Sequence, residues 1–131
     1  MPYTPYADAE YYHSVYEGNE IPGEKLDERL KVASRHIDSL TYNRIVGRGF
    51  SNLTEFQQEV IREVCCRQAE FEHENADLLD TVLSSYSLNG VSMGFDGQSW
   101  NIYADKGIAM RKADYELLSQ TGLTCRLAVG R

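Results

Sequence analysis

Two long segments with apolar residues at helical spacing constrain the fold of this chain more than any other feature. In the first segment, residues 24–41, apolar positions recur at alternating steps of four and three, which places them on one face of a helix. Acidic side chains gather in its first turns, where the helix dipole favours them. The apolar positions are Leu26, Leu30, Ala33, Ile37 and Leu40.

The second segment begins at Thr54, which fits a helical capping box with Gln57 three residues later. This helix should run to about Asn75 and carry an ion pair between Glu63 and Arg67 on its outer face. Each long helix exposes one apolar face, so we expect the two to pack together. The second apolar stripe comprises Phe56, Val60, Val64 and Phe71, flanked by Ile61 and Cys65.

Shorter elements are predicted before and between the long helices. Asp8 can cap a helix over residues 9–15. Tyr12 and Tyr16 would share one face of this helix, because they are four residues apart. Residues 44–51 contain two closely spaced glycines and are predicted to form a turn or loop.

The part of the chain after the second long helix has a different character. Asn89-Gly90 separates two short alternating runs, and this dipeptide favours the tight turn of a β-hairpin. We predict a hairpin and loop over about residues 84–107, in which residues 96–107 form a mobile or partner-ordered loop. A lone two-stranded hairpin is marginally stable in water, so this one should depend on the helices or on another chain.

The chain should end with a third helix over residues 108–121, with Met110, Ala113 and Leu117 on one face and Gly122 just past its end. Residues 123–131 would follow as a short strand or extended tail, left for neighbours to cover. The predicted fold class is therefore mainly α. It is a small helical bundle of two long helices and shorter N- and C-terminal helices, with a protruding β-hairpin or loop, in one domain of 131 residues.

Composition narrows the function classes. The net charge of −7 disfavours a protein that grips nucleic acid by neutralising phosphates. The nine tyrosines suit either a shallow core or a surface that meets other proteins. No segment is apolar enough to span a bilayer. The odd number of cysteines, three, and the N-terminus without a secretory signal predict free buried thiols in a reducing cytoplasm.

Candidate chemistry is sparse. Glu70, Glu72 and Glu74 crowd one helix end, but a solvated acidic face is a better explanation than a general acid–base pair. His73 beside them lacks the recurrent spacing of a zinc site, and the adjacent Cys65 and Cys66 would point about 100° apart on a helix. We therefore expect no catalytic residues, no cofactor and no metal. The chain is instead predicted to be a module that binds other proteins.

The order of these segments resembles a known family. The chain reads IPGEKLDERLKVASRHIDSLTYNRI, then LTEFQQEVIREVCCRQAEFEHEN, then SYSLNGVSMGF, and finally LLSQTGLTCRLAV. It is similar, over nearly its whole length, to the small head-tail connector (adaptor) proteins of siphophages and related prophages. The most specific parts are Ala33 to Ile45 and Leu118 to Arg126.

The resemblance implies a structural virion protein at the neck, made in the bacterial cytoplasm. It would form a ring, commonly of twelve copies, that attaches to the portal protein after packaging. The ring would join the capsid to the next connector, stopper or tail protein, and DNA would pass through without specific binding. The implied contacts are Tyr86, Leu88, Asn89, Gly90, Val91 and Met93 in the hairpin, and Leu123, Thr124, Arg126, Leu127 and Val129 in the portal-binding tail.

Two other classes stay open. One is another phage neck or tail protein, a stopper or tail terminator, which would be richer in strands. The other is a small helical regulator that binds a host protein or DNA, although neither long helix is basic enough to be a recognition helix. An enzyme is the least favoured class.

Overall fold

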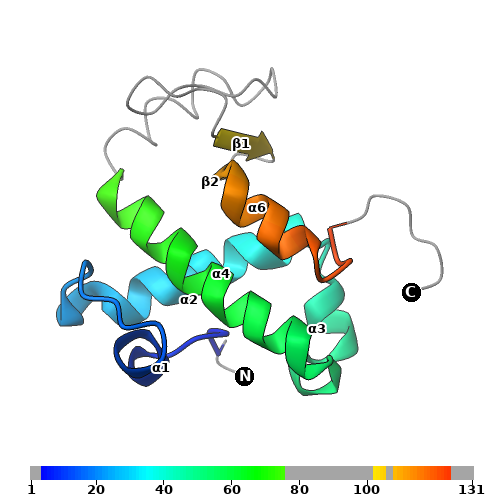
Figure 1. Ribbon diagram of the computed structural model, residues 1–131, viewed down its shortest axis with the longest axis horizontal. Helices are drawn as coiled ribbons and strands as arrows, with labels where there is room; N and C mark the ends of the chain where they lie inside the picture. Colours follow the sequence, from blue (N-terminus) through cyan, green and yellow to red (C-terminus); the bar gives the residue numbers. More distant parts are fainter. Residues whose placement is uncertain (1–3, 76–101, 106–107, 125–131) are drawn as a thin grey trace.

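The computed structural model describes residues 4–75, 102–105 and 108–124 (Figure 1). Over these ranges the chain is mainly helical, which confirms the predicted fold class. The proposed hairpin around Asn89-Gly90 and the tail beyond Thr124 lie outside the described residues. In chain order the elements are α1 (Ala9–Ser14), α2 (Gly23–Leu40), α3 (Arg44–Arg48), the 3-10 helix η1 (Phe50–Asn52), α4 (Glu55–Glu74), β1 (Ile102–Asp105), β2 (Ile108–Arg111) and α6 (Lys112–Ser119).

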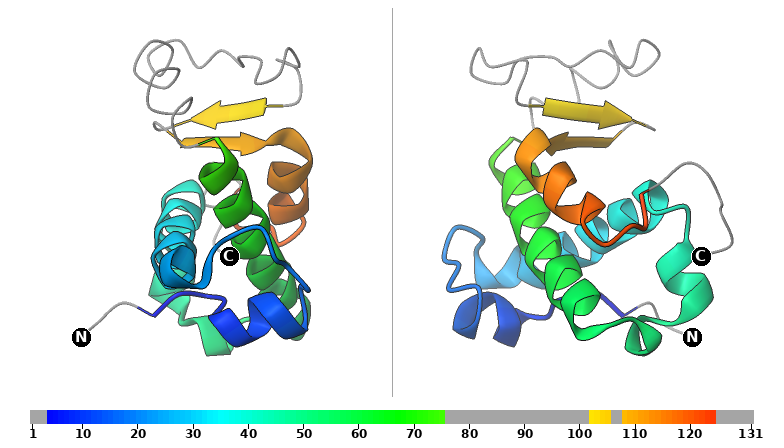
Figure 2. Two further views of the ribbon diagram at one scale, coloured as in Figure 1. Left: turned by 90° about the vertical axis from the view of Figure 1, so that its left-hand side faces the viewer. Right: turned by 45° about the vertical axis from the view of Figure 1, so that its right-hand side comes forward.

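The helices α2 and α4 form the centre of the molecule and pack against each other, as predicted. Figures 1 and 2 show α4 crossing α2, with α1 at one end of the pair. The helix α6 lies on the side of α4 that faces away from α2, and the β1–β2 ribbon lies near the C-terminal end of α4. The α4 N-terminus has the predicted capping box, in which Thr54 Oγ1 accepts from the Gln57 backbone N–H at 3.1 Å. All five predicted core residues of α2 are buried.

The predicted stripe of α4 needs one correction. Val60, Val64 and Phe71 are buried, together with Ile61 and Cys65, but the Phe56 side chain is 54% exposed. Phe56 lies in the first turn of α4. None of the described elements covers the apolar face of the helix at this end, so the side chain remains exposed.

The helix α1 begins after Asp8, whose carboxylate accepts from the Tyr11 backbone N–H at 2.9 Å. This confirms the predicted N-cap. Tyr12 is buried, and its ring stacks on that of Tyr16 with centroids 5.7 Å apart. Tyr16 itself lies beyond the helix, because α1 ends at Ser14.

The predicted turn or loop over residues 44–51 is wrong. The segment instead forms α3 followed by η1. Ile45 is fully buried and fixes this segment to the core, so packing outweighs the low helix propensity of Gly47. Gly49, with φ +86°, ends α3 in a conformation that favours glycine.

The predicted loop is wrong at residues 102–105, and the start of the predicted helix 108–121 is also wrong. β1 pairs with β2 in an antiparallel ribbon, with Tyr103 opposite Met110. The run from Ile108 to Met110 is buried at all three positions, and a short continuous apolar run fits a buried strand as well as a helix.

The helix α6 therefore begins only at Lys112, and its buried face differs from the predicted one. Asp114 and Leu118 are buried, whereas Ala113 is exposed. Gly122, with φ +79°, lies just beyond the helix end and donates its N–H to the Ser119 carbonyl at 3.0 Å.

Leu123 belongs to the hydrophobic core, with 2% of its surface exposed, and Thr124 is buried as well. The Arg44 guanidinium donates to the Leu123 carbonyl at 3.0 Å, and the Gln57 amide donates to the Thr121 carbonyl at 3.0 Å. The start of the predicted tail is thus part of the folded body. Within the described ranges, no helix combines the length and apolar character needed to cross a membrane.

Candidate functional site: an aromatic groove beside α1

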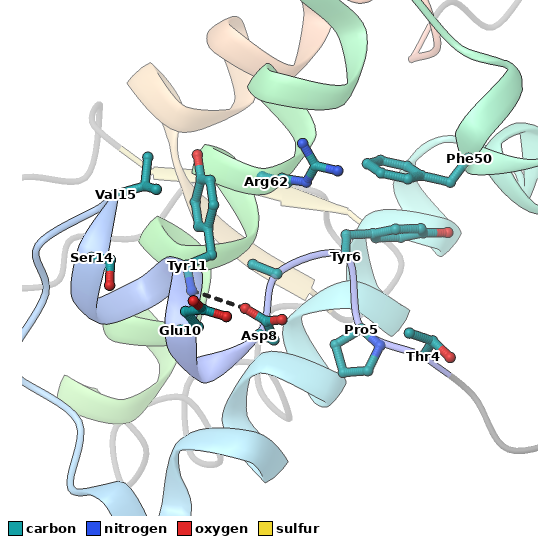
Figure 3. A pocket seen from close by; sticks show the side chains of 11 residues that line it. Thr4, Pro5, Tyr6, Asp8, Glu10, Tyr11, Ser14, Val15, Phe50 and Arg62 are labelled. Carbon is teal, nitrogen blue, oxygen red and sulfur yellow. Dashed lines mark hydrogen bonds between the residues drawn. The ribbon is translucent and has the colours of Figure 1, made fainter. Parts of the chain in front are cut away.

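An open groove of about 620 Å³ lies beside α1, between the N-terminal segment, η1 and α4 (Figure 3). This volume is within the roughly 300–1,000 Å³ range of ligand-binding pockets. We call it the aromatic groove, because three aromatic rings line it. The lining residues are Thr4, Pro5, Tyr6, Ala7, Asp8, Glu10, Tyr11, Ser14, Val15, Phe50 and Arg62.

The N-terminal segment is held in place by polar contacts with α2. The Tyr6 backbone N–H donates to Ser34 Oγ at 3.0 Å, and the Tyr6 hydroxyl donates to the Asp38 carboxylate. These contacts orient the Tyr6 ring against Phe50, with ring centroids 5.1 Å apart and planes tilted by 30°. Residues far apart in sequence thereby form one aromatic wall.

Arg62 supplies the positive charge of the groove. Its guanidinium carbon lies 5.1 Å from the centre of the Phe50 ring, a cation–π geometry. Glu59 precedes it by three residues on α4, a spacing that allows an ion pair, yet no described carboxylate pairs with Arg62. The half-buried guanidinium is therefore available at the groove surface.

Tyr11 carries a second polar group of the groove. The side chain is half-buried, and its hydroxyl forms no hydrogen bond with any residue that the structure describes. Burial raises the pKa of Tyr11, and the carboxylates of Glu59 and Glu63 raise it further, whereas Arg62 opposes the shift. The hydroxyl therefore stays protonated at neutral pH and can act as a donor.

The opposite side of α1 is a closed contact that we call the tyrosine–glutamate cluster, made of Tyr12, Tyr16 and Glu70. The Tyr12 hydroxyl donates to Glu70 Oε2 at 2.7 Å, and the Tyr16 hydroxyl donates to Glu70 Oε1 at 3.0 Å. The backbone N–H groups of Glu20 and Ile21 donate to the Tyr12 oxygen at 3.0 and 3.2 Å. Burial, followed by the hydrogen bond to Glu70, raises the pKa of Tyr12 to about 12.

The other two glutamates at this end of α4 have separate partners. Glu72 is buried and contacts His36 on α2, and it accepts from the Gln68 amide at 2.8 Å. Glu74 lies 3.4 Å from the Arg111 guanidinium on β2. The three carboxylates therefore connect α4 to different elements, and the predicted solvated acidic face is wrong for Glu72, which is buried between α4 and α2.

The end of α4 also holds a predicted ion pair. The Arg67 guanidinium lies 2.8 Å from Glu63, which confirms that prediction, and 3.4 Å from the buried Asp114 on α6. Burial raises the pKa of Asp114, although the nearby Arg67 and Arg111 oppose the shift. Among the described residues, no group of three or more histidine, cysteine and acidic side chains is arranged to hold a metal ion.

Cys65 and Cys66 are free and buried, as predicted. Burial raises the pKa of Cys65 to about 11 even though a contact with Ser34 lowers it, and burial also raises the pKa of Cys66. Both are therefore neutral thiols near pH 7, which is the unreactive form. Cys125 lies outside the described residues.

Two of the predicted partner-contact residues are described by the structure, and the others are not. The side chains of Leu123 and Thr124 are buried in the protein's own body, so the prediction that they face a partner is corrected. Leu123 packs in the core because it follows a turn that Arg44 and Gln57 hold in place. The others, Tyr86, Leu88, Asn89, Gly90, Val91, Met93, Arg126, Leu127 and Val129, lie outside the described residues and stay predictions.

Sequence reasoning missed the aromatic groove. Its walls come from the N-terminal segment, from η1 and from the middle of α4, and no local spacing connects these segments. The abundance of tyrosine was the one available signal, because it left a surface role open. Comparison of the chain with protein families, curated proteins and solved structures found no match.

Proposed function

We propose that this protein is a structural virion component, a head-tail connector of a tailed bacteriophage, and not an enzyme. In this proposal it forms a ring of twelve copies at the neck of the virion. One side of the ring binds the portal protein, and the other binds a downstream connector, stopper or tail protein. DNA passes through the ring without specific binding.

The observation that carries the proposal is the composition of the aromatic groove. Tyr6, Tyr11, Phe50 and Arg62 meet at an open surface, and tyrosine, phenylalanine and arginine are the residue types enriched at protein–protein interfaces. Such residues also dominate binding energy when they are desolvated by a partner. The groove therefore supports a function in protein binding, which is the class to which connectors belong.

Two further features are consistent with an assembly role. Head-to-tail rings need two different contact surfaces on each subunit. Apart from the groove, the described surface exposes Val46 on α3 and Phe56 on α4, at 59% and 54% of their surface. The mainly helical architecture also favours a connector over the strand-rich stopper or tail terminator.

Electron microscopy of the full-length protein mixed with the portal protein of the same virus tests the proposal. We expect annular portal particles that are lengthened at one end. Unchanged portal particles, at protein concentrations that saturate a micromolar interaction, would overturn it.

A truncation sharpens the same test. A chain that ends at Thr124 retains the Leu123 contact with α3 and the Thr121 contact with α4, so it should keep its helical circular dichroism spectrum. If the last residues bind the portal, this truncated protein should fold but fail to lengthen the particles. Full attachment by the truncated protein would exclude the tail as the portal contact.

A further inference from the structure

We propose that the aromatic groove binds an acidic side chain of a partner protein, presented next to an aromatic residue. The carboxylate would pair with Arg62, and the neighbouring ring would pack on Tyr6 and Phe50. The inference names the chemistry of a partner and goes beyond the connector proposal, because it depends on the groove alone.

The first step of the argument is the state of Arg62. Two other arginines satisfy their guanidinium groups within the protein: Arg67 pairs with Glu63, and Arg44 donates to the Leu123 carbonyl. Arg62 has only the Phe50 ring as a described partner. A half-buried charge without a counter-ion is costly, and a planar guanidinium matches a carboxylate in two-point geometry.

The second step is the apolar surface beside that charge. The Tyr6 and Phe50 rings pack together, and Arg62 approaches the Phe50 ring from another direction. Figure 3 shows Arg62 between the Tyr11 and Phe50 side chains. An aromatic side chain of the partner would bury its ring here and exclude water from the ion pair, which strengthens it.

The third step is the distribution of charge along the groove. Asp8 and Glu10 lie near the backbone of Tyr11, on the side away from its hydroxyl (Figure 3). Asp8 is also occupied in capping α1. The carboxylate of the partner is therefore directed toward Arg62 and the Tyr11 hydroxyl. This hydroxyl is a second donor, because it has no hydrogen-bond partner among the described residues.

The carboxylates of Glu59 and Glu63 should weaken the affinity of the groove for an acidic side chain. Both carboxylates act on the Tyr11 hydroxyl, so they oppose an incoming anion at that side. Glu63 is neutralised by Arg67 at 2.8 Å, whereas Glu59 has no described partner. Replacing Glu59 by glutamine should therefore strengthen binding of an acidic segment.

Two uncharged-end peptides, N-acetyl-phenylalanyl-glutamate amide and its glutamine counterpart, provide matched probes. Titration of the full-length protein, followed by NMR of the Tyr6, Tyr11 and Phe50 ring signals, should show saturable shifts with the glutamate peptide. The glutamine peptide should bind about tenfold more weakly, because one charge-assisted contact is worth about 1.4 kcal/mol or more. Equal affinities, or no shifts with the glutamate peptide up to solubility, would overturn the proposal.

Variants assign the effect to the groove. Arg62→Gln should abolish the preference for the glutamate peptide, Arg62→Lys should retain part of it, and Glu59→Gln should increase it. Arg29→Gln, on α2 outside the groove, removes the same charge and should leave the preference unchanged. An Arg29→Gln protein that loses the preference, or an Arg62→Gln protein that keeps it, contradicts the proposal.

The failure of this inference is distinguishable from failure of the connector proposal. Portal attachment is measured by microscopy on the assembled particles, whereas the groove is measured by peptide binding to the isolated protein. If Arg62→Gln does not fold by circular dichroism, the Arg62→Lys and Glu59→Gln variants still decide the outcome.

Discussion

Tyr11 and Tyr12 are neighbours on α1, but they meet opposite environments. The Tyr12 ring is fully buried and its hydroxyl takes part in three hydrogen bonds, one to Glu70 and two from backbone N–H groups. The Tyr11 ring is half-buried in the wall of the aromatic groove, and its hydroxyl has no described hydrogen-bond partner. The same residue type therefore stabilises the fold on one face of α1 and remains available for binding on the other.

The difference teaches how a short helix can serve both purposes. α1 has only six residues, too few to be stable alone. The tyrosine–glutamate cluster fixes it to α4 and to the following loop, and this anchoring gives the aromatic groove a rigid wall. Substitutions of Tyr12 should therefore change stability, and substitutions of Tyr11 should change binding.

The largest expected effect is that of Tyr12→Phe. The change removes the donor to Glu70 and the acceptor for the Glu20 and Ile21 N–H groups. Leaving buried polar groups unsatisfied costs about 1–3 kcal/mol each, so the free energy of unfolding should fall by about 2–4 kcal/mol. Urea denaturation measures this change, and a loss below about 1 kcal/mol would show that the cluster does not anchor α1.

A somewhat smaller effect is expected from Gly18→Ala. A Cβ atom at this position would lie 2.4 Å from Cζ of the Tyr12 ring, so the ring or the loop must shift. Such overpacking costs about 1–3 kcal/mol. Gly47→Ala is the matched control, because nothing lies within 4 Å of its added Cβ, and it should be neutral or slightly stabilising. Equal thermal shifts for both variants would contradict the close packing.

Alkaline pH should also weaken the tyrosine–glutamate cluster. The pKa of Tyr12 is about 12 in the folded protein and about 10 in the unfolded chain. The unfolded state therefore loses this proton first, and the contribution of Tyr12 to stability is complete below pH 10 and is lost as the pH rises toward 12. The slope from this group is at most about 1.4 kcal/mol per pH unit.

Denaturation of the wild-type protein and Tyr12→Phe between pH 9 and pH 12 measures that slope. The variant should show a shallower decline, with the remaining slope due to other groups such as Tyr16, whose pKa is also raised by burial. Parallel declines in the two proteins would mean that Tyr12 titrates alike in the folded and unfolded states.

The smallest effect is predicted for Tyr11→Phe. The hydroxyl has no described hydrogen bond to lose, so stability should change by less than about 0.5 kcal/mol. The same variant should bind the acidic probe peptide more weakly, because one donor at the groove is gone. A large loss of stability would contradict the assignment of this face to binding.

The sequence predicted the centre of the fold well, since local patterns determine it. The periodic apolar residues of α2 and the Thr54–Gln57 capping box are short-range signals, and both helices lie within one or two residues of their predicted bounds. The Asp8 cap of α1 was predictable for the same reason. In these segments local preference and tertiary packing favour the same structure.

The errors lie where packing decides between local alternatives. The buried run Ile108–Ala109–Met110 fits a helix or a strand, and pairing with β1 makes it a strand. Ile45 fixes a helical turn despite the neighbouring glycines. The aromatic groove could not be predicted at all, because contact between Tyr6, Phe50 and Arg62 exists only after α2 and α4 are packed.

The attachment of the chain near Leu123 also has a mechanical consequence. The carbonyl groups of Thr121 and Leu123 are held by side chains of α4 and α3, and the Leu123 side chain is inserted in the core. A pulling force applied beyond Thr124 would load these contacts first and pass directly into the two-helix centre. The β1–β2 ribbon, which precedes α6, would carry none of that load until the anchorage broke.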